Sequence, residues 1–261
     1  MRHYLIAASL ILAVSLLAAA PGRSQRPQLP HLPPPPPPPV KPYQPVAVTP
    51  PPAFTDPSFT AFRAQLADAV AHKDRAALGK LVLAQGFFWM QDKDLADKRK
   101  PGIANLATAI DLDAKDGSGW DMLDGFAHEP TAEPLPDQQT VICAPAAPRF
   151  DLKAFEALIK STQTEPPDWG YPTKNGLDVR AAAKPDAPVV EKIGLILVRV
   201  LPDGAAPDNP NQAPLLHIAL PSGKTGFVSI EALSSLGGDQ MCYTKDASGW
   251  KIAGYYGGAA Q

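Results

Sequence analysis

The chain has 261 residues, 45% of them hydrophobic and 19% charged, and its formal net charge is −2 at pH 7. This length and composition allow one or two modest hydrophobic cores. The charges are scattered, without the basic patch that binds nucleic acid or an anionic membrane surface. We therefore expect neither nucleic acid nor a membrane surface as a partner.

Residues 1–24 have the layout of a secretory signal peptide. A short basic start, with Arg2 and His3, precedes an apolar run and an Ala-rich end. We expect the protein to be exported to the periplasm or secreted. The apolar run approaches the roughly 17–20 residues that span a bilayer, so the alternative is an uncleaved membrane anchor.

Residues 25–57 are rich in proline and include seven consecutive prolines, Pro33 to Pro39. Proline fixes φ and removes the backbone N–H donor, which predicts an extended polyproline II linker that rises about 3.1 Å per residue. The simplest interpretation is a stiff spacer. The alternative is an envelope scaffold that uses this tract to capture a proline-binding partner.

Residues 58–168 are expected to form an α-rich domain. Phe59, Phe62 and Leu66 recur at helical spacing behind a possible Ser58 or Asp56 cap. Similar patterns predict further helices over residues 75–83, 101–111 and 151–161, and "GFFWM" suggests a short buried strand.

The chain has two cysteines, Cys143 and Cys242. In an oxidising compartment two such thiols can pair and stay paired, so we predict a Cys143–Cys242 disulfide. The alternative is a pair of buried free thiols.

The tripeptide Gly223-Lys224-Thr225 imitates part of a phosphate-binding loop. A P-loop needs a first glycine five residues before the second, and Ile218 occupies that position. The flanking segments are both strand-like, whereas a P-loop joins a strand to a helix. The pattern therefore predicts a hairpin turn with Gly223 at positive φ, and no nucleotide site.

The sequence contains no nucleophile elbow and no histidine or cysteine spacing typical of a metal site. We therefore predict no catalytic residue, no metal and no cofactor. Two carboxylate pairs, Glu129 with Glu133 and Asp92 with Asp94, leave acid–base catalysis open, because sequence does not give their separation in space. A cysteine paired with His217 would need a thiolate, which a disulfide removes.

From about residue 169 the chain changes to short alternating segments typical of strands. Their order resembles the bacterial SH3 domain family over about residues 170–236. The positions that carry the resemblance are Val179, Arg180, Pro188, Val189, Gly194, Gly223, Gly226, Phe227 and Val228. The resemblance implies a small SH3-like β-barrel over residues 169–236, although Phe227 stands where tryptophan is common. The loop "PDGAAPDNPNQAP" is also longer than usual in the family.

Together these patterns predict an α+β fold: an α-rich domain, an SH3-like barrel and a C-terminal strand segment, residues 237–261, that packs on the α-rich domain. In general layout the chain also resembles exported, proline-linked proteins of alphaproteobacteria. The resemblance to bacterial SH3 domains implies binding to cell-wall peptide, glycan or a protein partner. We expect the contact surface to include Trp169, Tyr171, Arg180 and Phe227, because aromatic rings and an arginine offer stacking area and a fork of donors. The alternative is a cell-wall hydrolase that uses the barrel for targeting.

Overall fold

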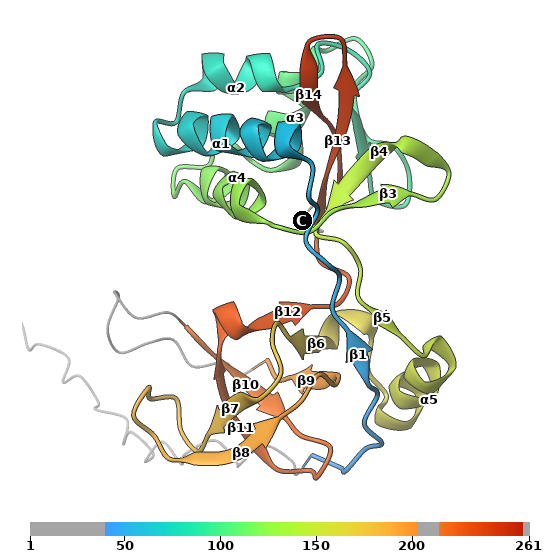
Figure 1. Ribbon diagram of the computed structural model, residues 1–261, viewed down its shortest axis with the longest axis vertical. Coiled ribbons are helices and arrows are strands. Elements are labelled where there is room, and N and C mark those ends of the chain that lie inside the picture. The colour runs from blue at the N-terminus through green and yellow to red at the C-terminus, as the bar shows by residue number, and fades with distance from the viewer. Residues whose placement is uncertain (1–39, 203–213, 258–261) are drawn as a thin grey trace, which may run out of the picture. The chain divides into compact units, whose positions relative to one another are not determined.

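The computed structural model describes residues 40–202 and 214–257 (Figure 1). The predicted signal peptide and the first part of the proline-rich linker lie outside the described residues. Within them the fold is mixed α+β, with five α-helices and sheets of two, five and seven strands. We describe two parts separately: a helical part, residues 50–146 and 239–257, and a sheet part, residues 40–49 and 149–236.

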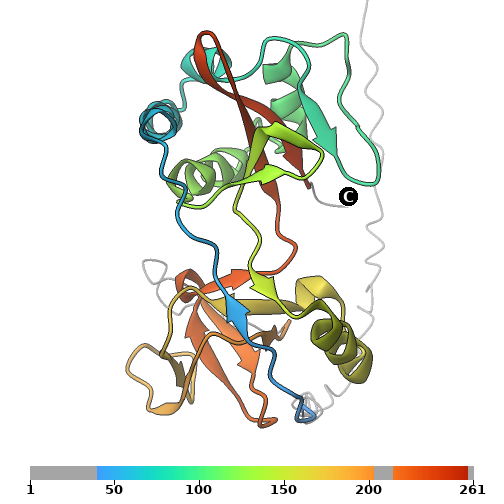
Figure 2. The same cartoon turned by 45° about the vertical axis from the view of Figure 1, so that its right-hand side comes forward.

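In the helical part, four helices cover one face of the five-stranded sheet (Figures 1 and 2). The strands lie in the order β2-β14-β13-β4-β3, antiparallel except for the parallel pair β2–β14. The elements are α1 (Pro57–Ala71), α2 (Arg75–Leu81), β2 (Phe88–Met90), α3 (Gly102–Ala109), α4 (Ser118–His128), β3 (Glu133–Leu135), β4 (Gln138–Ala144), β13 (Gln240–Asp246) and β14 (Gly249–Tyr256).

Two aspartates start the first helices. Asp56 accepts hydrogen bonds from the backbone N–H groups of Ser58 and Phe59, and Asp74 caps α2 in the same way. These bonds satisfy N–H groups that have no partner inside the helix. The apolar spacing of α1 then places Phe59 and Leu66 in the core. The helices predicted near residues 58, 75, 101 and 151 are present.

The helix α4 was not predicted. Its sequence, "SGWDMLDGFAH", contains two glycines, which weaken a helix by about 1 kcal/mol each relative to alanine. A Cβ on Gly119 would lie 2.6 Å from the Cα of Leu112 and 2.7 Å from the carbonyl oxygen of Asp111. The glycine therefore lets α4 pack closely against the backbone that precedes it.

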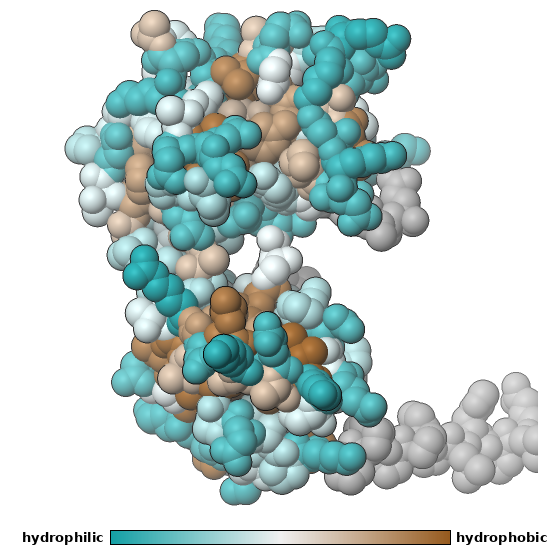
Figure 3. Space-filling model, turned by 90° about the vertical axis from the view of Figure 1, so that its right-hand side faces the viewer, coloured by the Kyte–Doolittle hydropathy of each residue, from teal (hydrophilic) through white to brown (hydrophobic). Residues whose placement is uncertain are grey.

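The C-terminal segment forms a hairpin of two strands, β13 and β14, where we expected one strand. The hairpin lies inside the five-stranded sheet, between β4 and β2. Tyr243 and Tyr255 point from it into the helix-covered core and are fully buried. The sheet's other face carries a smaller apolar cluster with Val141 and the two cysteines. Figure 3, viewed from the side of β3 and β4, shows hydrophobic residues gathered in the middle of this part, bordered by hydrophilic ones.

The sheet part contains the seven-stranded sheet, the helix α5 and a separate β1–β5 pair (Figure 1). Its strands run in the order β12-β6-β9-β10-β11-β7-β8. The elements are β1 (Val48–Thr49), β5 (Arg149–Phe150), α5 (Leu152–Thr162), η1 (Pro166–Asp168), β6 (Trp169–Pro172), β7 (Leu177–Arg180), β8 (Val189–Ile193), β9 (Val198–Val200), β10 (Leu215–Ala219), β11 (Thr225–Ser229), η2 (Ile230–Ala232) and β12 (Leu233–Ser235).

The prediction of a closed β-barrel over residues 169–236 was wrong. No pairing within the described residues joins β8 to β12, so the sheet has two free edges. After β11 the short helix η2 turns the chain, and β12 pairs with β6 at the edge far from β8. Ile193 of β8 and Leu233 of β12 nevertheless belong to one buried cluster. The sheet therefore curls around its core without closing.

Two segments that we assigned elsewhere contribute to a second buried cluster of the sheet part. Tyr43 and Val46, from the predicted proline-rich linker, are buried together with Trp169. Phe155 and Leu158, from α5, are buried there as well. The linker's last residues and α5 thus help to build the core beside β6.

Gly223 and Lys224 lie in the turn between β10 and β11, as predicted, and Thr225 begins β11. Gly223 has φ of 82°, and the two strands pair antiparallel from Ala219 opposite Thr225 outward. In the described ranges, no helix is long and apolar enough to cross a membrane.

Candidate ligand-binding row on the seven-stranded sheet

Two of the four predicted contact residues lie directly opposite each other. Phe227 on β11 pairs with Arg180 on β7, and on its other side Phe227 pairs with His217 on β10. The rings of His217 and Phe227 are stacked, with centroids 4.6 Å apart and planes 10° from parallel. We call these three residues the His217–Phe227–Arg180 row.

The row lies on the face of the sheet that points away from the curled core. Side chains alternate along a strand, and directly paired residues share a face. Ile218 and Val228, the neighbours of His217 and Phe227, are buried in the inner cluster. The row residues therefore point outward, and all three are half-buried.

Arg180 is held in place by the loop that follows β7. Its Nη1 donates a hydrogen bond of 2.9 Å to the carbonyl oxygen of Ala187. A guanidinium has five N–H donors, so this bond orients the group and leaves other donors for a ligand. Val189 on the edge strand β8 lies opposite Arg180 and is 46% exposed, which adds an apolar contact at the end of the row.

A salt bridge lies beside Arg180 on the same two strands. Lys192 Nζ is 2.9 Å from Asp178 Oδ1, and the two residues are directly paired on β8 and β7. The hydrogen bond from Lys192, with the charges of Lys192 and Arg180, lowers the pKa of Asp178. Asp178 is therefore ionised at neutral pH, and Lys192 offsets its charge.

The other two predicted contact residues, Trp169 and Tyr171, are core residues. Trp169 is 0% exposed, and its indole Nε1 donates a 2.8 Å hydrogen bond to Thr164 Oγ1. Tyr171 is also buried, and burial raises the pKa of its phenol. Rings that are 0% and 5% exposed offer a ligand almost no contact area, so neither residue belongs to the contact surface.

His217 was missed as a contact residue, although the sequence contained a signal for it. Once Gly223 marks the hairpin turn, counting outward pairs Ala219 with Thr225 and His217 with Phe227. Without the pairing register, the sequence suggests only that His217 could be the partner of a cysteine thiolate. The hairpin register gives it a different neighbour, the ring of Phe227.

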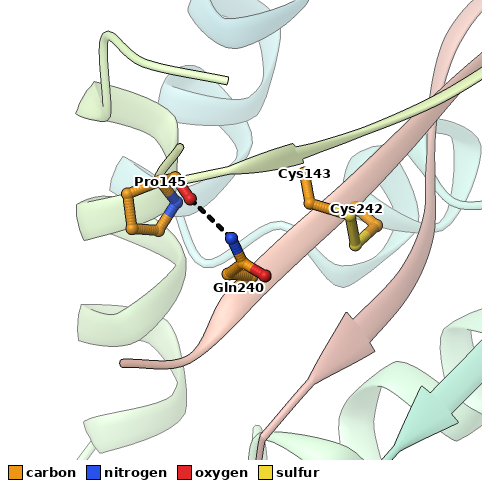
Figure 4. The surroundings of a disulfide bond; sticks show 4 residues. All are labelled: Cys143, Pro145, Gln240 and Cys242. Carbon is orange, nitrogen blue, oxygen red and sulfur yellow. Dashed lines mark hydrogen bonds between the residues drawn. A yellow bond between two sulfur atoms is a disulfide. The ribbon is translucent and has the colours of Figure 1, made fainter. Parts of the chain in front are cut away.

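Cys143 and Cys242 form a disulfide, with the sulfur atoms 1.97 Å apart (Figure 4). The two residues are directly paired on β4 and β13, and they are 1% and 0% exposed. Beside them, Gln240 Nε2 donates a 2.7 Å hydrogen bond to the carbonyl oxygen of Pro145. The disulfide therefore joins two core strands that lie 99 residues apart in sequence.

Three of the four carboxylates that left acid–base catalysis open, all except Asp92, bond to their own surroundings. Glu129 accepts from the backbone N–H and the hydroxyl of Thr131, and Glu133 accepts from the N–H of Ala147. Asp94 accepts from the N–H of Trp89 and pairs with Lys98. These bonds shape loops and strand ends.

Within the described residues, no group of three or more histidine, cysteine, aspartate or glutamate side chains could hold a metal ion.

Comparison with known proteins does not extend this description. No family model matches the chain, and no curated protein or solved structure matches it.

Proposed function

We propose that this protein is a non-catalytic, exported binding module of the cell envelope, and that the His217–Phe227–Arg180 row contacts a cell-wall peptide. The observation that carries the proposal is the row itself: an outward-facing ring stack beside an oriented guanidinium. The resemblance of residues 170–236 to bacterial SH3 domains supports an envelope ligand over other peptides.

The chemistry of the row favours a peptide that carries a carboxylate next to an apolar side chain. A guanidinium binds a carboxylate through two parallel N–H donors, and Arg180 has donors left after its bond to Ala187. The stacked rings of His217 and Phe227 offer a flat contact for an aliphatic chain. Val189 extends this apolar area toward the edge of the sheet.

Co-sedimentation with purified peptidoglycan tests the proposal. Replacing Phe227 or Arg180 with alanine should lower the affinity about tenfold, the usual effect of truncating a central interface residue. The bound fraction in the pellet should fall accordingly. Arg180→Lys keeps the charge but loses the fork of donors, so it should also weaken binding. Lys224→Ala is the matched control, because Lys224 is an exposed turn residue beside the same strands.

The same assay distinguishes the alternatives. Binding that is equal in all variants would contradict a role for the row. Released muropeptides would instead identify a hydrolase.

The scaffold alternative is tested by deleting part of the proline-rich tract. The deletion must leave the later linker residues in place, because Tyr43 and Val46 are buried in the fold. Removing residues 26–39 alone should leave peptidoglycan binding unchanged. Loss of partner capture with intact peptidoglycan binding would support a separate scaffold role.

A further inference from the structure

A groove in the helical part runs between α1, α2 and the β13–β14 hairpin. It consists of two hollows, of about 490 Å³ and 130 Å³, that share Gln65 and Leu81. The larger hollow is also lined by Ala64, Asp68, Ala77 and Lys80. The smaller one is also lined by Ser58, Phe62, Ser248, Gly249, Trp250 and Lys251. None of these residues belongs to the His217–Phe227–Arg180 row.

Trp250 gives the groove an anchored aromatic wall. Its ring packs against the edge of Phe59, with centroids 5.0 Å apart, and its Nε1 donates a 2.9 Å hydrogen bond to Ser58 Oγ. The side chain is half-buried, so part of the indole remains accessible. Lys245 Nζ lies over the same ring, 5.7 Å from its centroid, and Phe54 packs on it at 88°, with centroids 6.4 Å apart. A ligand can therefore contact only the part of the indole that these side chains leave exposed, and this part is already fixed in place.

Polar groups surround the indole. Gln65 is exposed on α1, and its amide can both donate and accept hydrogen bonds. Ser248 donates its hydroxyl proton to Asp246 and keeps its acceptor lone pairs. Gln65 and Ser248 therefore offer the groove both hydrogen-bond donors and acceptors.

Two lysines line the groove, Lys80 in the larger hollow and Lys251 in the smaller one. Lys251 Nζ donates a 2.7 Å hydrogen bond to the carbonyl oxygen of Lys80, which places the ammonium of Lys251 at the C-terminal end of α2. The side chain of Lys80 is exposed. The only acidic residue lining the two hollows is Asp68, whose Oδ1 lies 3.5 Å from His72. Two lysines and one aspartate thus line the hollows. Asp246 lies beside them: hydrogen bonds from Ser248 and the charge of Lys251 lower its pKa, so it offsets part of the charge of Lys251.

We propose that this groove binds a sugar chain that carries a carboxylate. The C–H face of a pyranose ring packs on an indole, because the ring face of tryptophan is electron-rich. Hydroxyl and acetamido groups match Gln65 and Ser248, and the carboxylate matches Lys80 and Lys251. Six of the twelve residues that line the two hollows are polar or charged, which suits a ligand rich in hydrogen-bonding groups.

A matched pair of disaccharides tests the proposal: N-acetylglucosaminyl-N-acetylmuramic acid, which carries a lactyl carboxylate, and uncharged chitobiose. Each is titrated into the folded protein while the indole N–H resonances are followed by NMR, with Trp250 assigned through the Trp250→Phe variant. We expect the Trp250 signal to shift with both sugars, and the acidic one to bind roughly tenfold more tightly, since one charge-assisted contact contributes about that factor.

Two exposed-residue variants avoid any effect on folding. Lys80→Ala should lower the affinity for the acidic disaccharide to about that for chitobiose, and Gln65→Ala should weaken both. Arg180→Ala should leave both affinities unchanged, so this test fails or succeeds independently of the row. A Trp250 signal that neither sugar shifts, equal affinity for the two sugars, or tighter binding of poly-γ-glutamate than of the acidic disaccharide would overturn the proposal.

Discussion

Tyr43 donates a hydrogen bond of 2.9 Å from its hydroxyl to the carbonyl oxygen of Ala219, on β10 of the seven-stranded sheet. The ring of Tyr43 also meets Trp169 edge to face, with centroids 5.1 Å apart. Both contacts are buried, and burial raises the pKa of the Tyr43 phenol. The segment around Tyr43 therefore packs against the seven-stranded sheet, although its sequence predicts a proline-rich linker.

Replacing Tyr43 with phenylalanine should destabilise the protein by about 1–2 kcal/mol, because the buried hydrogen bond is lost while the ring remains. Tyr43→Ala should cost about 3–5 kcal/mol, since it also leaves a cavity beside Trp169. Chemical unfolding followed by fluorescence measures both. A protein that begins at residue 40 should fold, whereas one that begins at residue 50 should not. A stable protein without residues 40–49 would refute this role of the segment.

Two glycines of α4 give a matched test of close packing. A Cβ at Gly119 would lie 2.7 Å from the carbonyl oxygens of Ile110 and Asp111, which are backbone atoms that cannot easily move. We expect Gly119→Ala to destabilise the protein by at least about 1–3 kcal/mol. At Gly125 no atom lies within 4 Å of the added Cβ.

Gly125→Ala should therefore stabilise the protein by up to about 1 kcal/mol, because alanine is the better helix former. The opposite signs, measured by thermal unfolding of the two variants, check the packing of α4. Equal effects at Gly119 and Gly125 would contradict the close backbone approach.

Local patterns in the sequence predicted the elements that local interactions form. Asp56 caps α1, and Phe59 and Leu66 follow at helical spacing, so the helix could be read directly. Gly223 likewise marked the β10–β11 hairpin. The helix α4 was not predicted because its two glycines give it a weak helix propensity. The close approach at Gly119 involves backbone atoms outside the helix, which the local sequence does not reveal.

Long-range pairing and burial were beyond the sequence. The pairing of β12 with β6, which leaves the sheet open, joins strands about 60 residues apart and has no local signature. Trp169 was expected on the contact surface. An indole is common both in cores and in binding sites, and the residue type alone does not distinguish the two. Of the four predicted contact residues, Arg180 and Phe227 remain, since both face outward on neighbouring strands.

Asp97 should make stability depend on pH in the acidic range. The Arg99 side chain donates two hydrogen bonds of 3.0 Å to its carboxylate, and these bonds with the Arg99 backbone N–H lower the pKa of Asp97 to about 2. In the unfolded chain an aspartate has a pKa of about 3.9. The unfolded state therefore binds more protons between these values, and stability falls as pH falls from about 4 to 2.

The Asp97→Asn variant cannot titrate, so its unfolding midpoint should fall less steeply than that of the wild type between pH 4 and 2. Arg99→Ala removes the donors and should flatten the profile in the same way. Urea unfolding at several pH values measures the slopes. A slope unchanged in both variants would show that other carboxylates control acid unfolding.

The Cys143–Cys242 disulfide should contribute a large share of the protein's stability. It joins residues 99 apart in sequence, and closing a loop of about 100 residues stabilises a fold by about 4–5 kcal/mol in the chain-entropy model. Because the two cysteines are 1% and 0% exposed, a reductant should act only after the strands open. The double variant Cys143→Ala, Cys242→Ala should therefore unfold at a clearly lower denaturant concentration than the oxidised protein.

Reduced wild-type protein should unfold close to the double variant, and intact mass should rise by two hydrogens on reduction. The protein should react with a thiol-specific reagent only after denaturation in the presence of reductant. Because Cys143 and Cys242 are directly paired on core strands, loss of the bond removes a constraint on the unfolded chain more than a contact in the folded one. Equal unfolding midpoints with and without the bond would contradict this account, whereas a lower midpoint with unchanged strand content in the folded state would support it.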